Sequence, residues 1–340
     1  MPSILAVPGI RVGHATDQDA RTGCTVVLGP FRAASDVRGL ATGTRELDAV
    51  TPDHVVPRID ALLLTGGSAF GLAAADGVVR WHEERGLGYD TRAARVPIVP
   101  AAVVYDLAVG RADVRPDARM GYAACEDAAD RATGGTLEEG AVGAGTGCTV
   151  GKILGLDGAA RGGVGSWAER RGPVAMGALA VVNAVGDVRG EDGRIIAGAR
   201  GPDGRFVDSE RLLRETADPR APGFADRTDE IEPPPPGANT TLIVLATNAP
   251  LDRAALRVLA RAGSTAMARR ITPVHTNFDG DVVFAVSTAA EGAALPPERM
   301  LALSALAAHV AEHALERAVG READRRPRGP KSERKEAEHG

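Results

Sequence analysis

A threonine that follows a proline-rich segment is the residue in this chain best placed to do chemistry. Thr240 comes directly after Asn239, a few residues beyond a run of four prolines (Pro233–Pro236), and it opens the apolar, β-branched run 240–248. A cut between Asn239 and Thr240 would give the threonine a free α-amine beside its own hydroxyl. The reference pKa of such an amine is about 8, so it can serve as the general base that activates the hydroxyl. The alternative is a loop followed by a core strand.

Three more polar residues lie beside or within apolar runs. Asp279 and Asp281 flank Gly280 before the run 282–286, and Asn183 lies inside the strand expected over 176–185. Asp-Gly between apolar strands is first of all a tight-turn signal. Beside Thr240, however, one carboxylate could hold the α-ammonium while the other positions the hydroxyl or shares a proton with its neighbour. Asn183 is either a hydrogen-bonded amide at a strand end or an NH₂ donor to an oxyanion.

Two glycine-rich stretches resemble phosphate loops without matching them. Residues 143–152 have Thr146 where the first glycine of a P-loop is needed, and no hydroxyl residue follows Lys152. Nucleotide binding is therefore not expected, although Lys152 remains a candidate cation. Residues 66–71 fit neither the dinucleotide-binding fingerprint nor the nucleophile elbow of hydrolases.

Neither a metal nor a cofactor is expected. His309, Glu312 and His313 have the spacing of a zinc-peptidase motif, but they lie in an alanine-rich helical stretch without a downstream acidic ligand. We interpret them as a helix surface. The three cysteines form no Cys-x-x-Cys pair and have no neighbouring histidine, so they are expected to be packing residues in a reducing compartment.

Composition indicates a globular protein that binds neither nucleic acid nor membrane. The 340 residues are 44% hydrophobic and 25% charged, with a net charge of −5 and no basic patch. No apolar run is long enough to span a bilayer, and the first residues lack the pattern of a signal peptide. We expect a cytoplasmic protein.

Strand and helix patterns alternate along most of the chain and predict an α/β fold. Residues 1–50 are expected to form short strands with turns, one of them at Gly29-Pro30, and residues 188–205 a hairpin. Residues 201–237 are expected to be a mobile or extended linker, and residues 321–340 a disordered charged tail after one domain over 1–320. The remaining predicted strands are 61–65, 96–104, 176–185, 240–248 and 282–288, and the predicted helices are 69–85, 116–131, 252–263 and 297–319.

Taken together, the chain resembles the L-aminopeptidase/D-esterase family of self-processing peptidases, which includes β-aminopeptidases and the nylon-oligomer hydrolase. The blocks that carry the resemblance are 7–14, 39–46, 64–72, 142–147, 239–242 and 279–281. The resemblance implies a four-layer α/β/β/α sandwich, shared in outline with ornithine acetyltransferase. It also implies self-cleavage between Asn239 and Thr240 into an α fragment (1–239) and a β fragment (240–340). Members of the family usually assemble as tetramers, so a homotetramer of processed units is expected.

The resemblance further implies a set of catalytic residues. Thr240 would be the N-terminal nucleophile, and the nylon-hydrolase branch has matches to Asp279, Asp281, Lys152, Asn183 and Tyr105. Family members with a serine nucleophile have Ser and Glu in place of the two aspartates, so the substrate class stays open. The expected function is an amidohydrolase that releases N-terminal residues from small peptides, amides or esters through an acyl-enzyme. The alternatives are a nylon-oligomer hydrolase, an acyltransferase and a non-catalytic binding protein.

Overall fold

Strand β2 (Thr22–Val37) connects the two halves of the fold. The structure is a computed structural model that describes residues 2–131, 135–216 and 239–320. The first half of β2 pairs with β1 (Arg11–Asp17) and β4 (Ile59–Thr65), and its second half with β16 (Val282–Ser287). The predicted turn at Gly29-Pro30 is wrong, because the chain continues as a strand and only shifts register there. Proline lacks the N–H that hydrogen bonds between strands require, so the pairing is locally irregular at Pro30. The flanking residues of β2 nevertheless stay paired, and the chain does not reverse its direction.

One continuous sheet of nine strands passes through β2. Its order is β10-β11-β14-β16-β2-β4-β7-β3, with β1 also on β2. The strands not yet introduced are β10 (Gly163–Arg171), β11 (Val174–Asn183), β14 (Thr240–Thr247), β7 (Ala101–Val103) and β3 (Thr44–Arg45).

The two halves of this sheet face each other and form the two inner layers of the molecule. Leu64 of β4 and Leu242 and Val244 of β14 belong to one buried cluster between them. Successive residues of a strand point to opposite faces, so Ile243 and Leu245 face away from that cluster, into a second core. This alternation explains why β14 is apolar at every position from 242 to 246.

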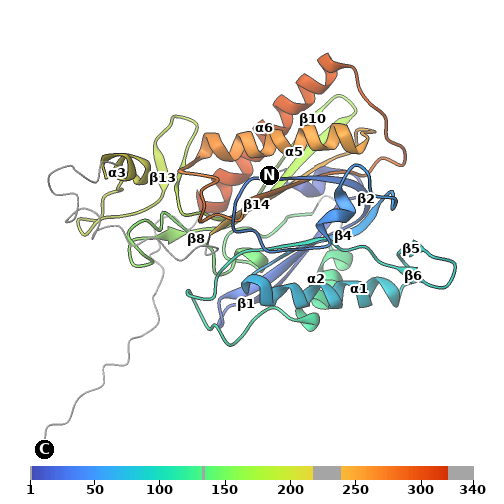
Figure 1. Cartoon of the computed structure of the whole chain (residues 1–340), viewed down its shortest axis with the longest axis horizontal. Helices are drawn as coiled ribbons and strands as arrows, with labels where there is room; N and C mark the ends of the chain where they lie inside the picture. The colour runs from blue at the N-terminus through green and yellow to red at the C-terminus, as the bar shows by residue number, and fades with distance from the viewer. Residues whose placement is uncertain (1, 132–134, 217–238, 321–340) are drawn as a thin grey trace, which may run out of the picture.

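Helices cover both outer faces, as Figure 1 shows. Helices α5 (Arg253–Arg270) and α6 (Pro297–Gly320) pack on the β14 side of the sheet, and α1 (Ala74–Glu83) and α2 (Ala118–Asp130) pack on the β1 and β2 side. Three buried clusters therefore separate four layers. The predicted α/β/β/α sandwich is confirmed.

The predicted elements are largely present, with some changes of extent. The helix expected over 69–85 begins as a 3-10 turn, η3 (Ser68–Ala73), and the strand expected over 96–104 is divided between β6 (Arg95–Val96) and β7. Part of the expected linker is helical, as α3 (Ser209–Glu215); residues 217–238 and the expected tail 321–340 lie outside the described residues. The remaining short elements are η1 (Ile4–Ala6), η2 (Leu47–Val50), η4 (Gly143–Gly145), β5 (Tyr89–Asp90), β8 (Thr149–Val150), β9 (Ala160–Arg161), β12 (Asp187–Arg189), β13 (Ile195–Ala197) and β15 (Ile271–Thr272).

Candidate active site

Thr240 lies where three strand ends meet. It is the first residue of β14 and pairs with Asn183, the last residue of β11, while Asn239 bridges to Asp279 just before β16. Because β14 runs parallel to β16 and antiparallel to β11, these three ends share one edge of the sheet. Thr240 itself is only 2% exposed.

The carbonyl of Asn239 accepts two hydrogen bonds. The Thr240 hydroxyl donates one over 2.6 Å between Oγ1 and the carbonyl oxygen, and the main-chain N–H of Gly280 donates the other over 2.8 Å. A Cβ atom at position 280 would lie 2.7 Å from Thr240 Oγ1, so only glycine fits there without displacement. The Gly280 N–H is therefore placed to stabilise negative charge on this oxygen, and the Thr240 hydroxyl lies against the same carbonyl group.

Asp281 has both carboxylate oxygens occupied. Oδ1 accepts from the N–H of Thr241 over 2.7 Å, and Oδ2 accepts from the main-chain N–H of His275 over 3.2 Å. The His275 ring nitrogen Nδ1 lies 2.9 Å from the same Oδ2. The carboxylate is therefore fixed beside the start of β14. His275 was not among the residues predicted from the sequence, and only its closeness to the Asp-Gly-Asp turn along the chain indicates it there.

Asp279 is held separately, by Thr276. Oδ2 of Asp279 accepts from the main-chain N–H of Thr276 over 2.9 Å and from its hydroxyl over 2.6 Å. Burial, followed by the charge of Asp281, raises the pKa of Asp279 to about 6. The two carboxylates thus have different environments, although they are two residues apart.

Lys152 and Asn183 form a buried pair beside the threonine. Nζ of Lys152 donates to Oδ1 of Asn183 over 2.8 Å and to its main-chain oxygen over 3.2 Å. Oδ1 of Asn183 also accepts from the N–H of Thr149, and Nδ2 donates to the carbonyl of Tyr105 over 3.0 Å. Burial lowers the pKa of Lys152 to about 7, against the opposing charges of Asp279 and Asp106 and the effect of Cys148. Its charge therefore changes near neutral pH.

Tyr105 enters the site through its backbone, and the next residue contributes a buried acid. The Tyr105 side chain is half-buried, and among the described residues its hydroxyl forms no hydrogen bond. Asp106 accepts from the Thr22 hydroxyl and from the N–H of Gly67, each over 2.7 Å. Burial raises the pKa of Asp106 to about 6. Asp106 was not among the residues predicted from the sequence, where its only signal is its position after Tyr105.

The glycine-rich loop 143–152 is not a phosphate cradle. Its N–H groups already have partners: Thr149 donates to Asn183, and Gly151 and Lys152 donate to the carbonyls of Gly186 and Val185. The loop instead positions Lys152.

The zinc-like residues are also engaged elsewhere. Glu312 pairs with Arg269 and Arg270, and the His309 ring contacts Glu169. Among the described residues, no group of three or more His, Cys, Asp or Glu could hold a metal ion. Within the same residues, no helix is both long and apolar enough to cross a membrane.

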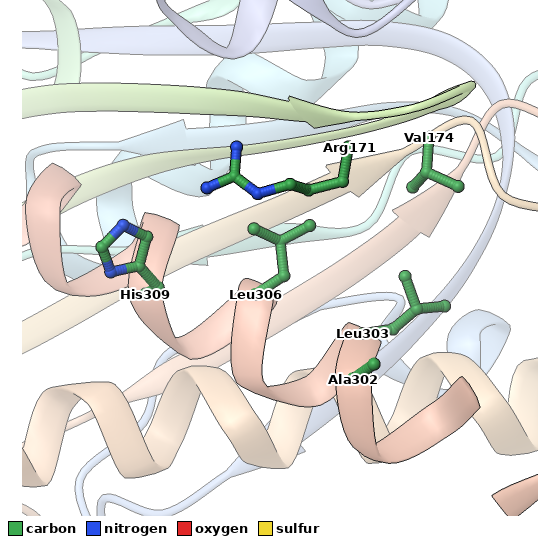
Figure 2. Close-up of a pocket in the computed structure, with 6 residues that line it drawn as sticks. All are labelled: Arg171, Val174, Ala302, Leu303, Leu306 and His309. Carbon is green, nitrogen blue, oxygen red and sulfur yellow. The ribbon is translucent and has the colours of Figure 1, made fainter. Parts of the chain in front are cut away.

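A cavity of about 480 Å³ lies at a different place on the molecule. Figure 2 shows the β10–β11 hairpin over α6, with Arg171 extending above Leu306 toward His309. Val174, which also lines this cavity, and Asn183 are the two ends of the ten-residue strand β11. At about 3.3 Å per residue they are roughly 30 Å apart, so this cavity is separate from the site around Thr240.

Comparison with known proteins gives three consistent likenesses. The chain matches Peptidase family S58 over residues 2–326. It is 42% identical over 320 residues to an uncharacterized aminopeptidase of Mycobacterium leprae, covering 89% of this chain and 83% of that one. It is 33% identical over 286 residues to a 6-aminohexanoate-oligomer endohydrolase of a Kocuria species, covering 83% and 73%.

A solved structure shares the fold. The L-aminopeptidase D-Ala-esterase/amidase of Ochrobactrum anthropi, described as a variant of the Ntn hydrolase fold, aligns with a TM-score of 0.65 at 20% identity. The alignment covers 93% of this chain and 85% of that structure. At 20% identity this similarity shows a shared fold only.

Proposed function

This chain belongs to peptidase family S58 and is a hydrolase, and we propose that it cleaves itself to become an amidohydrolase with Thr240 as its N-terminal nucleophile. The observation that carries the proposal is the convergence of the Thr240 hydroxyl and the Gly280 N–H on the carbonyl of Asn239. The hydroxyl thus lies at the bond that has to break. The substrates are small peptides, amides or esters from which an N-terminal residue is released.

The first stage is self-cleavage. Thr240 Oγ1 attacks the carbonyl carbon of Asn239, and the Gly280 N–H, already 2.8 Å from the carbonyl oxygen, stabilises the charge on it. The C–N bond breaks, the proton released by the hydroxyl passes to the threonine nitrogen, and an ester links Asn239 to Oγ1 of Thr240. Water hydrolyses this ester, which leaves a carboxylate on Asn239 and a free amine on Thr240.

The second stage is turnover of substrate. The free amine takes the proton of its own hydroxyl, and Oγ1 attacks the substrate carbonyl. The C–N bond of the substrate breaks as the α-ammonium returns this proton to the leaving amine, and water hydrolyses the resulting acyl-enzyme. Lys152, 2.8 Å from Asn183 Oδ1, brings positive charge to the site. We assign Lys152 and Asn183 to oxyanion stabilisation, with Tyr105 holding the Asn183 amide through its carbonyl. Asp281 and Asp279 control the charge around the amine.

A second candidate is the hydrolysis of 6-aminohexanoate oligomers. It is favoured by the 33% identity to an endohydrolase of that name and by the presence of Thr240, Asp279 and Asp281 together. A panel of aminoacyl p-nitroanilides and amide oligomers separates the two: the first candidate predicts the higher kcat/KM on the anilides. Gel filtration tests the further expectation of a homotetramer of processed units, and cell fractionation tests the expectation of a cytoplasmic location.

Denaturing mass spectrometry of wild type and Thr240→Ala tests the proposal. Wild type is expected as fragments 1–239 and 240–340, and the variant as one intact, inactive chain. Active wild-type protein that consists of the intact chain would refute self-cleavage. Unchanged amidase activity in the variant would refute the nucleophile, while activity in neither protein, with substrate still bound, would favour a binding protein. Acyl transfer to an added amine in place of water would identify a transferase.

A further inference from the structure

His275 occupies an unusual position in the loop before β16. Its backbone φ is +55°, in the left-handed region that residues with side chains seldom adopt. A conformation of this kind persists only where the surrounding contacts enforce it. Here it allows the main-chain N–H and the ring of His275 to reach the same oxygen of Asp281.

Both ring nitrogens of His275 face acceptors. Nδ1 lies 2.9 Å from Asp281 Oδ2, and Nε2 lies 3.3 Å from the carbonyl oxygen of Ser264 on α5. Neither partner atom carries a hydrogen to donate, so a neutral imidazole could satisfy only one of them. An imidazolium, with two N–H groups, satisfies both.

The charges around the ring favour that form. The carboxylates that act on it are Asp281, in contact, and Asp279, further away. On the α5 side the ring meets Ser264, whose hydroxyl donates to Asp36, and Asp36 in turn pairs with Arg38. Burial lowers the pKa of His275, but the hydrogen bond and charge of Asp281 more than offset this and raise it. The side chain is 20% exposed, so protons from solvent can reach it.

We propose that His275, as an imidazolium, is a positioning residue that holds Asp281 against β14 and offsets its charge, and thereby sets the charge around the Thr240 amine. The connection is continuous, because Asp281 Oδ1 binds the N–H of Thr241, the residue next to the nucleophile. This inference rests on the proposed function, since it concerns the amine that self-cleavage would release.

The reason lies in the balance of charge at the site. Two unpaired carboxylates beside an amine would stabilise its ammonium form, which cannot accept a proton from the hydroxyl. An imidazolium on Asp281 cancels one of these charges and keeps the amine available as a base. Removing the positive charge should therefore raise the pKa of the amine, by about one pH unit for a charge several ångströms away.

Replacement of His275 by asparagine and by alanine separates charge from packing. In His275→Asn a neutral amide can take the place of Nδ1–H, and asparagine tolerates a positive φ. We expect it to fold and to cleave itself, with the acidic limb of its kcat/KM profile moved up by about one pH unit. His275→Ala loses the donor as well, so kcat should fall at least tenfold with little change in KM. His309→Asn is the matched control. His309 lies on α6, and its ring nitrogen Nε2 is 3.0 Å from a carboxylate oxygen of Glu169 that is not part of the candidate active site.

The outcomes are distinguishable. If wild type does not cleave itself, the proposed function fails. If wild type cleaves itself and both His275 variants have its pH profile and its kcat within twofold, this inference fails. Should neither variant fold, an NMR titration of His275 in intact Thr240→Ala protein decides: a ring that is already neutral at pH 6.5 overturns the proposal, and a ring still charged there supports it.

Discussion

Replacing Lys152 with methionine should stabilise the folded chain while strongly slowing catalysis. The ammonium of Lys152 is completely buried, and its pKa falls from 10.5 to about 7. At about 1.4 kcal/mol per pH unit, this disfavours the charged form by roughly 4–5 kcal/mol in the folded state. Methionine has a similar length and needs no solvation, so this cost disappears.

The gain is reduced by the hydrogen bonds that are lost. Nζ donates to Oδ1 and to the main-chain oxygen of Asn183, and each acceptor left without a donor costs about 1–3 kcal/mol. Oδ1 keeps the N–H of Thr149, which moderates the loss. We therefore expect Lys152→Met to be more stable than its parent by about 1–2 kcal/mol near pH 7. Its kcat/KM should fall by about 10²–10³ because the positive charge near the oxyanion is gone.

The pH dependence provides the sharper test. The folded state binds fewer protons than the unfolded state between pH 7 and 10.5, so the penalty on the parent is complete below pH 7 and vanishes as the pH approaches 10.5. Guanidinium unfolding at pH 7 and pH 10, with Thr240→Ala as the parent so that every chain is intact, measures the difference. The reasoning is refuted if the methionine variant is less stable at pH 7, or if its advantage does not shrink toward pH 10.

Three further changes have defined outcomes. Gly280→Ala puts a Cβ 2.7 Å from Thr240 Oγ1 and should slow self-cleavage at least tenfold in time-resolved mass spectrometry; a wild-type rate contradicts this. Asp279→Asn in Thr240→Ala protein should raise stability by about 1–3 kcal/mol at pH 7 and by nothing at pH 4. The sign follows because burial raises the pKa of Asp279 from 3.8 to about 6, so ionisation above that range costs the parent stability; equal melting temperatures at pH 7 refute it. Asp106→Ala leaves the Thr22 hydroxyl and the Gly67 N–H without an acceptor and should cost about 2–4 kcal/mol in urea unfolding, most of which Asp106→Asn should restore.

Most strands and helices of the fold could be predicted from the sequence because apolar runs and turn residues are local patterns. The apolar runs that became β11, β14 and β16 have polar residues within them or close to their ends, and three of these, Asn183, Thr240 and Asp279, meet at one sheet edge. Composition and periodicity alone did not bring them together. The resemblance to a family did, since contacts between distant segments leave no mark on local sequence pattern.

The features that were missed depend on tertiary geometry. Gly29-Pro30 is a turn signal by residue type, yet neighbours on both sides keep β2 extended through it. The role of His275 depends on a positive φ and on the approach of α5, and neither can be derived from a single histidine in a loop. Asp106 likewise acquires its role only when Thr22 and Gly67 converge on it.

The strand order has a consequence for the life of a cleaved molecule. Strands β14 and β16 of the proposed β fragment lie between β11 and β2 of the α fragment, so neither piece contains a complete sheet. The precursor folds as one chain. After cleavage, refolding would require the α and β fragments to associate, and each fragment alone lacks part of the sheet and of the hydrophobic core. Processing would make folding a one-way event, with the mature molecule preserved by its slow unfolding rather than by reversible equilibrium.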